Sequence, residues 1–304
     1  AEITDHTLDV VRKTYLCLLK HLLVTRQDMD KQNLVVDTDP GLDDALALSY
    51  LWQNHDIDLI TTVAGNASLK DVTDNATALR DEHDSTTPIR KGASAPIEAK
   101  QVIGDFHGQN GLGSINTSPT TVNDFHTDQL PDNPIFLAIG PLTNIADMVS
   151  AVPQGTRCFI LGGTLAEGTI HGEEFNLYAD PHAATRVLQS HLDITLLPID
   201  TASPHGIPVN DADTYHTGQT MMQRVWDEHR RASQRVQASH VTPYDLILAH
   251  LVFNRDQYKT TPYDVTVHTG RQRRGHLETH DGQSVDIITD LQDGVTEQAL
   301  SKTL

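Results

Sequence analysis

Apolar and polar positions follow two alternating patterns from about residue 33 onward. Short runs rich in Val, Ile and Leu have the length of buried strands, and they predict strands at Asn33–Asp37, Ile57–Val63, Pro134–Ile139, Arg157–Leu161 and Ile194–Pro198. Stretches with helical spacing lie between them, near Leu42–Gln53, Ser68–Glu82, Asn144–Ala151 and Pro181–His191. Strands that alternate with helices indicate βαβ units, so we expect an α/β fold with a mostly parallel, Rossmann-like sheet flanked by helices.

The C-terminal part of the chain adds further elements. Helical periodicity predicts helices at Thr220–Ser239 and Pro243–Asn254, which we expect to form a C-terminal helical region over the active site. Alternating positions near Tyr263–His268 and Val285–Thr289 predict a small β-unit at the end of the chain.

Residues 1–31 predict an N-terminal helical arm, followed by one domain over residues 32–304. The apolar stretch Tyr15–Val24 is interrupted by Lys20 and His21 and lacks the basic start and cleavage site of a signal peptide. It is also shorter than a membrane span. We therefore expect a short amphipathic helix there and a cytoplasmic protein.

The charge balance narrows the range of partners. Lys and Arg total 22 against 41 Asp and Glu, which gives a formal charge of −19. A surface this acidic disfavours nucleic acids and anionic membranes as partners, and it suits an enzyme with a neutral small-molecule substrate or a bound cation. The only cysteines, Cys17 and Cys158, are too few for a disulfide framework, and we expect both to be reduced.

Candidate chemistry is concentrated at the corner between the first predicted strand and helix. The run Val-Asp-Thr-Asp-Pro-Gly-Leu-Asp-Asp-Ala carries Asp37, Asp39, Asp43 and Asp44 within eight residues. Carboxylates this close repel one another and are costly to bury unless a cation neutralises them. Oxygen ligands favour Ca²⁺ or Mg²⁺. Helix capping alone accounts for acidic residues at Asp43 and Asp44, but it does not account for Asp37 and Asp39 at a strand end, where parallel sheets bind their ligands.

The aspartate run resembles the N-terminal motif of the inosine-uridine preferring nucleoside hydrolases. Further segments follow in that family's order along the chain: Val63-Ala64-Gly65-Asn66, His107-Gly108-Gln109-Asn110-Gly111-Leu112-Gly113, Gly140-Pro141-Leu142-Thr143-Asn144, Gly162-Gly163, Glu174-Phe175-Asn176 and Asp180-Pro181. Several segments in the same order are more specific than a single match. The resemblance covers roughly residues 33 to 290.

The resemblance implies Ca²⁺-dependent hydrolysis of the N-glycosidic bond of ribonucleosides to ribose and free base, by a homodimer or homotetramer. It implies a general base at Asp39, and metal ligands at Asp39, Asp44, Asp245 and the carbonyl of Thr143. It also implies substrate-binding side chains that contact the sugar: Asp43, Asn66, Glu174 and Asn176. Asp245 is matched by register only, in the run Thr242-Pro243-Tyr244-Asp245-Leu246.

This sequence differs from the family pattern at two positions, one that contacts the leaving base and one that contacts the 5′-hydroxyl of the sugar. Tyr244 stands where members commonly carry a His that protonates the base, and tyrosine, with a pKa of about 10, is a poorer acid near neutrality. Tyr244 is therefore a candidate for proton donation or for stacking on the base. His107, in the Gly-rich loop, is a second candidate near the base. Gly168 stands where the family has an Asn that contacts the 5′-hydroxyl, so that contact is in question.

Two alternatives remain open at this point. One is a catalytically impaired nucleoside- or sugar-binding protein that keeps the metal site, which Tyr244 and Gly168 suggest. The other is a haloacid-dehalogenase-type phosphohydrolase with Asp37 as nucleophile, since Val35-Val36-Asp37-Thr38-Asp39 mimics its nucleophile strand. Gly41 departs from that motif, which favours the nucleoside hydrolases.

Overall fold

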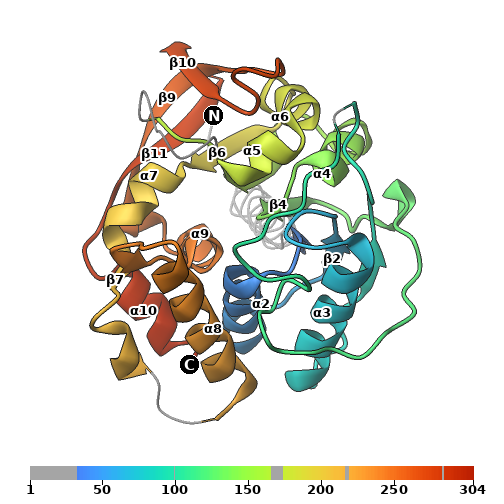
Figure 1. Cartoon of the computed structure of the whole chain (residues 1–304). Helices are drawn as coiled ribbons and strands as arrows, with labels where there is room; N and C mark the ends of the chain where they lie inside the picture. Colours follow the sequence, from blue (N-terminus) through green and yellow to red (C-terminus); the bar gives the residue numbers. More distant parts are fainter. Residues whose placement is uncertain (1–32, 99, 166–173, 216–218, 283) are drawn as a thin grey trace, which may run out of the picture.

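A computed structural model describes residues 33–98, 100–165, 174–215, 219–282 and 284–304. The predicted N-terminal arm (residues 1–31) and the departure at Gly168 lie outside these ranges. Within them, the chain forms one nine-stranded sheet (Figure 1). Its strands are β1 (Asn33–Thr38), β2 (Leu59–Thr62), β3 (Ile89–Lys91), β4 (Pro134–Ala138), β5 (Arg157–Leu161), β6 (Asp193–Leu197), β9 (Tyr258–Val267), β10 (Leu277–Asp281) and β11 (Val285–Leu291).

The order of the strands locates the ligand-binding edge of the sheet. The sheet runs β10-β9-β11-β6-β5-β4-β1-β2-β3, and every pair from β11 to β3 is parallel. The segment β3-β2-β1-β4-β5-β6 reverses direction between β1 and β4, which makes that point a topological switch. Ligands of open α/β sheets bind outside the carboxyl ends of the strands at such a point. The aspartate corner follows directly after β1.

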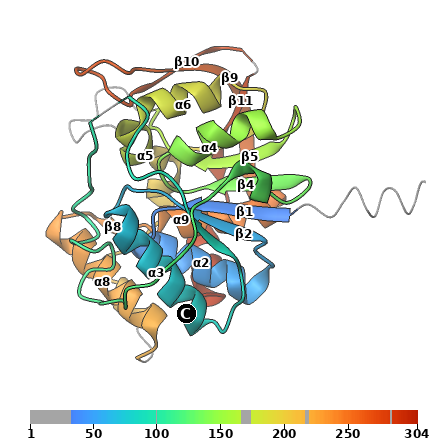
Figure 2. The same ribbon diagram turned by 90° about the vertical axis from the view of Figure 1, so that its right-hand side faces the viewer.

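Apolar residues in the strands build a separate core on each face of the sheet. In β1, Leu34 and Val36 belong to one core and Val35 to the other, because successive side chains of a strand point to opposite faces. Figure 2 shows the sheet between two layers of helices. On the first face lie α2 (Leu42–Asn54), α3 (Leu69–Glu82), α8 (Met221–Arg235), α9 (Tyr244–Phe253) and α10 (Val295–Ser301). On the second lie α4 (Thr143–Met148) and α6 (Pro181–Leu188).

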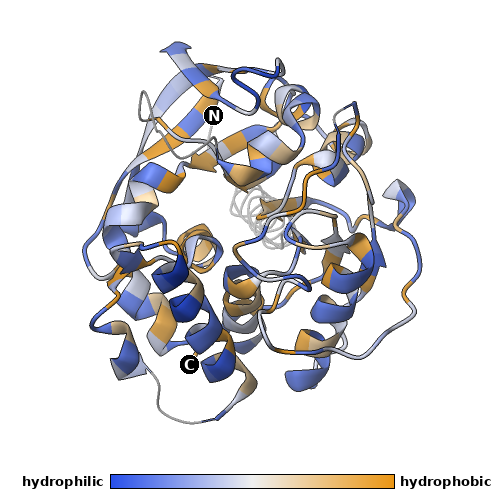
Figure 3. Ribbon diagram, in the orientation of Figure 1, coloured by the Kyte–Doolittle hydropathy of each residue, from blue (hydrophilic) through white to orange (hydrophobic). Residues whose placement is uncertain are grey.

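Hydropathy along the helices explains this layering. Helix α9 is largely apolar and lies near the centre of the view in Figure 3, where it packs against α2 and β5. Helix α8 is polar on one side only. Trp226 is fully buried on its inner side, while Arg224 and Gln234 face solvent. A helix with one apolar stripe packs that stripe on the core. Helix α8 therefore lies with its apolar side against the first core and its polar side in solvent.

Short elements complete the fold. They are the helices α5 (Phe175–Ala179) and α7 (Ile199–Ala202), the two-stranded sheet of β7 (Ile207–Pro208) with β8 (His240–Val241), and the 3-10 turns η1 (Thr127–Gln129), η2 (Val149–Ala151), η3 (Ser203–His205), η4 (Ala212–Tyr215) and η5 (Arg255–Gln257). None of the described helices combines the length and the apolar character that crossing a membrane requires.

The five strands predicted first are confirmed, with bounds that shift by at most two residues, and the α/β fold with a mostly parallel sheet is confirmed with them. The terminal strands predicted near Tyr263–His268 and Val285–Thr289 are found in β9 and β11, and with β10 they form the end of the main sheet. Val285–Leu291 pairs in parallel with β6 and antiparallel with β9, so the terminal strands extend the main sheet. Alternating residues predict a strand, but they carry no information about its distant partner.

Candidate active site

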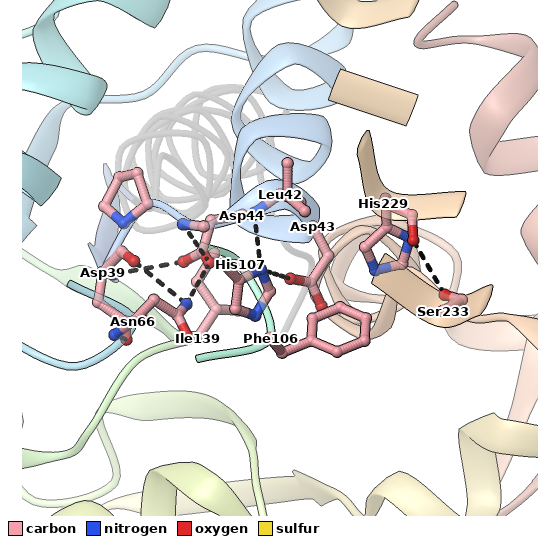
Figure 4. Close-up of polar contacts among 12 residues, drawn as sticks. Asp39, Leu42, Asp43, Asp44, Asn66, Phe106, His107, Ile139, His229 and Ser233 are labelled. Atoms are coloured by element: carbon pink, nitrogen blue, oxygen red, sulfur yellow. Dashed lines mark hydrogen bonds and ion pairs between the residues drawn. The ribbon is translucent and has the colours of Figure 1, made fainter. Parts of the chain in front are cut away.

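The corner after β1 brings the chain sharply from the strand into α2. Gly41 lets two side chains pack closely on this corner, because a Cβ atom there would lie 2.7 Å from Nδ2 of Asn66 and 2.8 Å from Nδ1 of His107. A larger residue at this position would therefore have to displace Asn66 and His107. The tight corner lets residues from β1, from α2 and from two later loops meet at the switch point between β1 and β4 (Figure 4).

Asp44 is the most constrained carboxylate of the corner. It accepts hydrogen bonds from the hydroxyl of Thr38 at 2.6 Å, from the backbone N–H of Gly41 at 2.9 Å and from Nδ2 of Asn66 at 3.1 Å. Asn66 also donates its backbone N–H to Oδ2 of Asp39 at 2.7 Å. These contacts fix the orientation of Asp39 and Asp44 from the loop after β2.

Asp245 joins the corner from the opposite end of the sequence. One carboxylate oxygen from each of Asp43, Asp44 and Asp245 lies within 4.8 Å of the other two, and all three residues are buried. Asp245 is the second residue of α9, while Asp43 and Asp44 lie in the first turn of α2. Two helix N-termini therefore direct acidic side chains at one point, where the positive end of each helix dipole favours negative charge.

Burial and mutual repulsion raise the pKa of these carboxyl groups. For Asp39 the main cause is desolvation, followed by the charge of Asp44, and its pKa stands well above the ordinary 3.8. Desolvation and the charge of Asp43 have the same effect on Asp245. Within the described residues, Oδ1 of Asp39 and Oδ1 of Asp245 have no hydrogen-bond partner although both are buried. A cation stabilises buried carboxylate oxygens that have no hydrogen-bond partner, so the donor groups of this cluster are suited to binding a metal ion.

Asp37 lies deeper than the rest of the corner. It is 0 % exposed, and its Oδ1 accepts hydrogen bonds from the hydroxyl of Thr61 at 2.5 Å and from Nδ2 of Asn144 at 2.7 Å. Asn144 in turn accepts the backbone N–H of Ala93 at 2.7 Å. Desolvation raises the pKa of Asp37 to about 7. These contacts tie β1, β2 and α4 together behind the site, which suits a supporting residue at Asp37.

A cavity of about 310 Å³ opens over the acidic cluster, a size typical of small-molecule sites. Its wall combines polar and aromatic side chains from five regions of the chain. The residues that line it are Asp43, Asn66, Phe106, His107, Ile139, Leu161, Glu174, Phe175, Asn176, Ile199, His229, Ser233, Val236, Ala238, His240, Thr242, Tyr244 and Asp245.

All four residues predicted to bind the sugar, Asp43, Asn66, Glu174 and Asn176, line this wall. Glu174 accepts hydrogen bonds from the backbone N–H groups of Gly163 at 3.0 Å and Asn176 at 2.7 Å. Nδ2 of Asn176 donates to the carbonyl of Ile139 at 3.1 Å. These bonds hold Glu174 and Asn176 at the carboxyl ends of β4 and β5, beside Asp43 and Asn66.

Thr143 differs from the other predicted ligands. It begins α4 just after β4, but it does not line the cavity, and its hydroxyl donates to Asp180 at 2.8 Å. Asp39 and Asp44 are likewise 0 % exposed and lie behind the cavity wall. The structure thus brings Asp44 and Asp245 together with Asp43. Asp39 is not part of that group and is linked to Asp44 through Asn66, and the ligand roles of Asp39 and Thr143 stay predictions.

His107 is held by the start of α2. Its Nδ1 lies 3.0 Å from the backbone nitrogen of Leu42, which donates to it, and 3.8 Å from Oδ1 of Asp43. Desolvation lowers the pKa of His107 to about 4. Because Nδ1 accepts a hydrogen bond and the ring is neutral, the contact with Asp43 is no charged pair. The ring proton is therefore on Nε2, at the side of the ring away from Leu42.

The hydroxyl of Tyr244 already has a hydrogen-bond partner, Ser203. Its hydroxyl lies 2.9 Å from Oγ of Ser203, and desolvation is the main cause of a pKa above its ordinary value of 10. Both observations weaken a role as proton donor. Its ring forms part of the cavity wall next to Asp245.

Two cavity residues, Phe106 and His229, carried no sequence signal that singled them out. Phe106 precedes the Gly-rich loop motif, and His229 lies in α8 among 17 histidines in the chain. The rings of Phe106 and His229 meet edge-on with centroids 5.6 Å apart. Desolvation lowers the pKa of His229 to about 4. Only the folding of α8 over the strand ends brings His229 to the cavity.

Comparison with known proteins agrees with this geometry. Residues 34–297 match the family model described as inosine-uridine preferring nucleoside hydrolase. The chain is 30% identical over 258 residues to the non-specific ribonucleoside hydrolase RihC of Escherichia coli (strain K12 / DH10B), a match that covers 78% of this chain and 84% of that protein.

Solved structures share the fold. An inosine-guanosine nucleoside hydrolase superposes with a TM-score of 0.76 at 21% identity, over 90% of this chain and 98% of its own. A purine-preferring ribonucleoside hydrolase from Gardnerella vaginalis gives the same TM-score and coverage at 18% identity.

Proposed function

Because the chain belongs to the inosine-uridine preferring nucleoside hydrolase family, and so is a hydrolase that acts on the N-glycosyl bonds of ribonucleosides, we propose that it works with a bound Ca²⁺ ion and releases ribose and the free base. We further propose that residues 32–304 form the catalytic domain and that it assembles as a homodimer or homotetramer.

One observation carries the proposed metal dependence. The carboxylates of Asp43, Asp44 and Asp245 converge within 4.8 Å, and buried Oδ1 atoms of Asp39 and Asp245 have no hydrogen-bond partner in the described part of the chain. An all-oxygen donor set favours a hard cation, and flexible coordination by several carboxylates favours Ca²⁺ over Mg²⁺. We assign Asp39, Asp44, Asp245 and the carbonyl of Thr143 as the residues that would hold it.

A Ca²⁺ ion bound there supplies Lewis-acid chemistry, because it lowers the pKa of a nearby water and binds hydroxyl oxygens. The chain's own residues do the rest. Asp39 is the proposed general base, and the backbone N–H of Asn66 holds its Oδ2 in place at 2.7 Å. A base must lie within hydrogen-bond reach of the proton it takes, and this contact keeps the carboxylate from rotating.

Sugar binding falls to polar groups on the cavity wall. We propose that Asp43, Asn66, Glu174 and Asn176 bind the ribose hydroxyls. Glu174 and Asn176 are already oriented by backbone contacts at 2.7–3.1 Å, so little side-chain freedom is lost on binding. Their negative and dipolar groups also stabilise the positive charge that the sugar ring develops as the bond to the base breaks.

The leaving base is assigned to the opposite side of the cavity. We propose that His107 donates a hydrogen bond from Nε2 to the base, which stabilises the negative charge that appears there. A neutral imidazole can act in this way without transferring its proton. We propose that Tyr244 contributes mainly its ring to this side, because its hydroxyl is bonded to Ser203 at 2.9 Å.

The test combines metal analysis with a reducing-sugar assay. We expect purified protein to contain about one equivalent of calcium. We also expect it to release ribose from inosine or uridine, to lose that activity in EGTA, and to recover it with CaCl₂ rather than MgCl₂ or ZnCl₂. Ribose release that is unchanged by complete removal of divalent ions would exclude the metal-dependent mechanism.

A second candidate is a nucleoside-binding protein with impaired catalysis. The bond between Tyr244 and Ser203 favours it, because this hydroxyl is poorly placed to protonate a base. Calorimetric binding of inosine and uridine without ribose release would support this candidate over the hydrolase.

A further inference from the structure

The side chain of His229 is the buried polar group of the cavity that the proposed mechanism leaves unused. The residue is 2 % exposed and lines the cavity from the inner face of α8. Its Nδ1 atom is buried and makes no hydrogen bond to any described residue. Buried polar atoms of folded proteins nearly always have a hydrogen-bond partner, and the described residues supply none for this nitrogen.

The surroundings of His229 hold its ring in one place. The rings of Phe106 and His229 form a T-shaped pair with centroids 5.6 Å apart, and the indole of Trp226 is tilted against the imidazole with centroids 6.2 Å apart. The backbone carbonyl of His229 accepts the hydroxyl of Ser233 at 3.0 Å, which satisfies that cavity-lining hydroxyl within the helix. The imidazole of His229 is therefore a cavity-lining side chain of α8 with unused hydrogen-bonding capacity.

The chemistry around His229 suits a flat aromatic ring with polar edges. Phe106 provides an apolar face, and Val236 and Ala238 continue this apolar wall toward the mouth of the cavity. Asp43 lies between His229 and the carboxylates of Asp39 and Asp44 (Figure 4). Asp43, Glu174 and His229 line the same cavity, so a base attached to a ribose held at the two carboxylates shares that cavity with this wall. A neutral imidazole offers it one donor and one acceptor.

We propose that His229 is a specificity-determining residue that hydrogen-bonds the nucleobase of the bound ribonucleoside, with Phe106 against the base. This inference rests on the proposed function for the substrate class. Only a substrate whose leaving group is a heterocycle with hydrogen-bonding atoms can form this hydrogen bond with His229. His229 transfers no proton in this role: it contributes to the binding of the base and to its stability as it leaves.

Two substitutions separate the hydrogen bond from the shape of the side chain. His229→Phe keeps an aromatic ring beside Phe106 and Trp226 and removes both nitrogens. His229→Gln keeps hydrogen-bonding groups. Gln234→Ala is the matched control, since Gln234 is an exposed residue of the same helix. Equal thermal midpoints for the four proteins establish that each is folded.

The kinetic test compares inosine and uridine with 4-nitrophenyl β-D-riboside, whose leaving group has no ring nitrogen and departs without assistance. We expect His229→Phe to lower kcat/KM for at least one nucleoside by about 10- to 100-fold, as for a lost buried hydrogen bond, and for the nitrophenyl riboside by less than about threefold. His229→Gln should retain more nucleoside activity than His229→Phe. Equal losses on all three substrates, or no loss on any, would overturn the role of His229.

A binding measurement keeps this test separate from the test of hydrolysis. Pseudouridine and formycin B are C-nucleosides, whose sugar–base bond cannot be hydrolysed. We expect calorimetry to give a Kd for at least one of them that is about tenfold weaker for His229→Phe than for wild type and unchanged for Gln234→Ala. If the wild type binds these compounds more tightly than His229→Phe but cleaves no riboside, the proposed hydrolysis is refuted and the His229 contact is supported. Equal affinities of wild type and His229→Phe for both compounds would refute the contact.

Discussion

The Nδ1 atom of His107 accepts a hydrogen bond of 3.0 Å from the backbone N–H of Leu42, the first residue of α2. The N–H groups in the first turn of a helix have no partner within the helix. A side chain 65 positions away in the sequence thus supplies one. The same bond fixes the tautomer of His107, because an acceptor nitrogen carries no proton. His107 therefore caps α2 and offers Nε2–H as a donor.

Two substitutions at His107 separate these roles. In His107→Asn the side-chain oxygen can replace Nδ1 as the acceptor, whereas Nε2–H is lost. We expect this variant to keep its free energy of unfolding within about 0.5 kcal/mol and to lose about 10-fold or more in kcat/KM for nucleosides. His107→Ala should lose similar activity and, in addition, about 1 kcal/mol of stability. Urea unfolding and steady-state kinetics check both. Equal stability of the Ala and Asn variants contradicts the capping role.

Neutralising one carboxylate of the acidic cluster has opposite effects with and without metal. In the metal-free protein Asp245 is repelled by Asp43 and Asp44, so Asp245→Asn should raise the thermal midpoint in EGTA. In saturating CaCl₂ the wild type gains about 2.7 kcal/mol at 100 times its Kd, and the variant should gain much less because its Ca²⁺ affinity is lower. The order of the two midpoints should therefore reverse. Differential scanning fluorimetry in both buffers measures it.

Asp193→Asn provides the control for this reversal. Asp193 is exposed at the start of β6 and lies outside the acidic cluster, so its loss removes the same formal charge without touching the site. We expect wild type and this variant to gain equally from calcium. If Asp245→Asn also gains as much as wild type, Asp245 is no metal ligand.

Stability of the metal-free protein should fall as pH rises. Burial raises the pKa of Asp37 to about 7 and that of Asp39 well above 3.8, whereas in the unfolded chain both titrate near about 3.9. Between these values the folded state binds more protons than the unfolded state, so the free energy of unfolding decreases with pH. The contribution is fully present below about pH 4 and is lost as pH rises through about 7. Urea midpoints in EGTA from pH 4.5 to 7.5 test this.

Calcium should counteract this loss of stability as the pH rises. Binding requires ionised carboxylates, so the affinity for Ca²⁺ rises with pH, and the gap between the calcium-loaded and metal-free midpoints should widen from pH 5 to pH 7.5. Asp37→Asn should flatten the slope of the metal-free protein, because Asn does not titrate. A gap that is constant across this range contradicts the assignment of raised pKa values to the cluster.

Much of the fold is predictable from the sequence because its central strands are buried on both faces. A strand such as Arg157–Leu161 is then a continuous apolar run with polar limits, and its bounds are recovered. The three-residue strand Ile89–Lys91 is too short to leave such a run. The pairing of Val285 with Ile194 joins residues far apart in the sequence, and no local pattern specifies it.

The site is predictable where its residues lie in a contiguous motif. Asp39, Asp43 and Asp44 share one corner, so their spacing alone indicates a cation site. Asp245 is predicted only because it aligns with the late aspartate of the family that the sequence resembles. Its carboxylate lies close to that of Asp44 because α9 packs against α2. His229 has no motif. It reaches the cavity because Trp226, three residues earlier, is buried in the core and fixes the rotation of α8.

Removing the hydroxyl of Tyr244 distinguishes its two candidate roles. If that hydroxyl were the acid that protonates the leaving base, Tyr244→Phe would lower kcat by about 10²- to 10⁴-fold, as loss of general acid catalysis does. The hydroxyl is instead bonded to Ser203, and its pKa is raised by burial, so we expect a loss of less than about tenfold for inosine and uridine. Ser203→Ala should have an effect of similar size, because it breaks the same bond. A large loss in Tyr244→Phe with none in Ser203→Ala would return the proton-donor role to Tyr244.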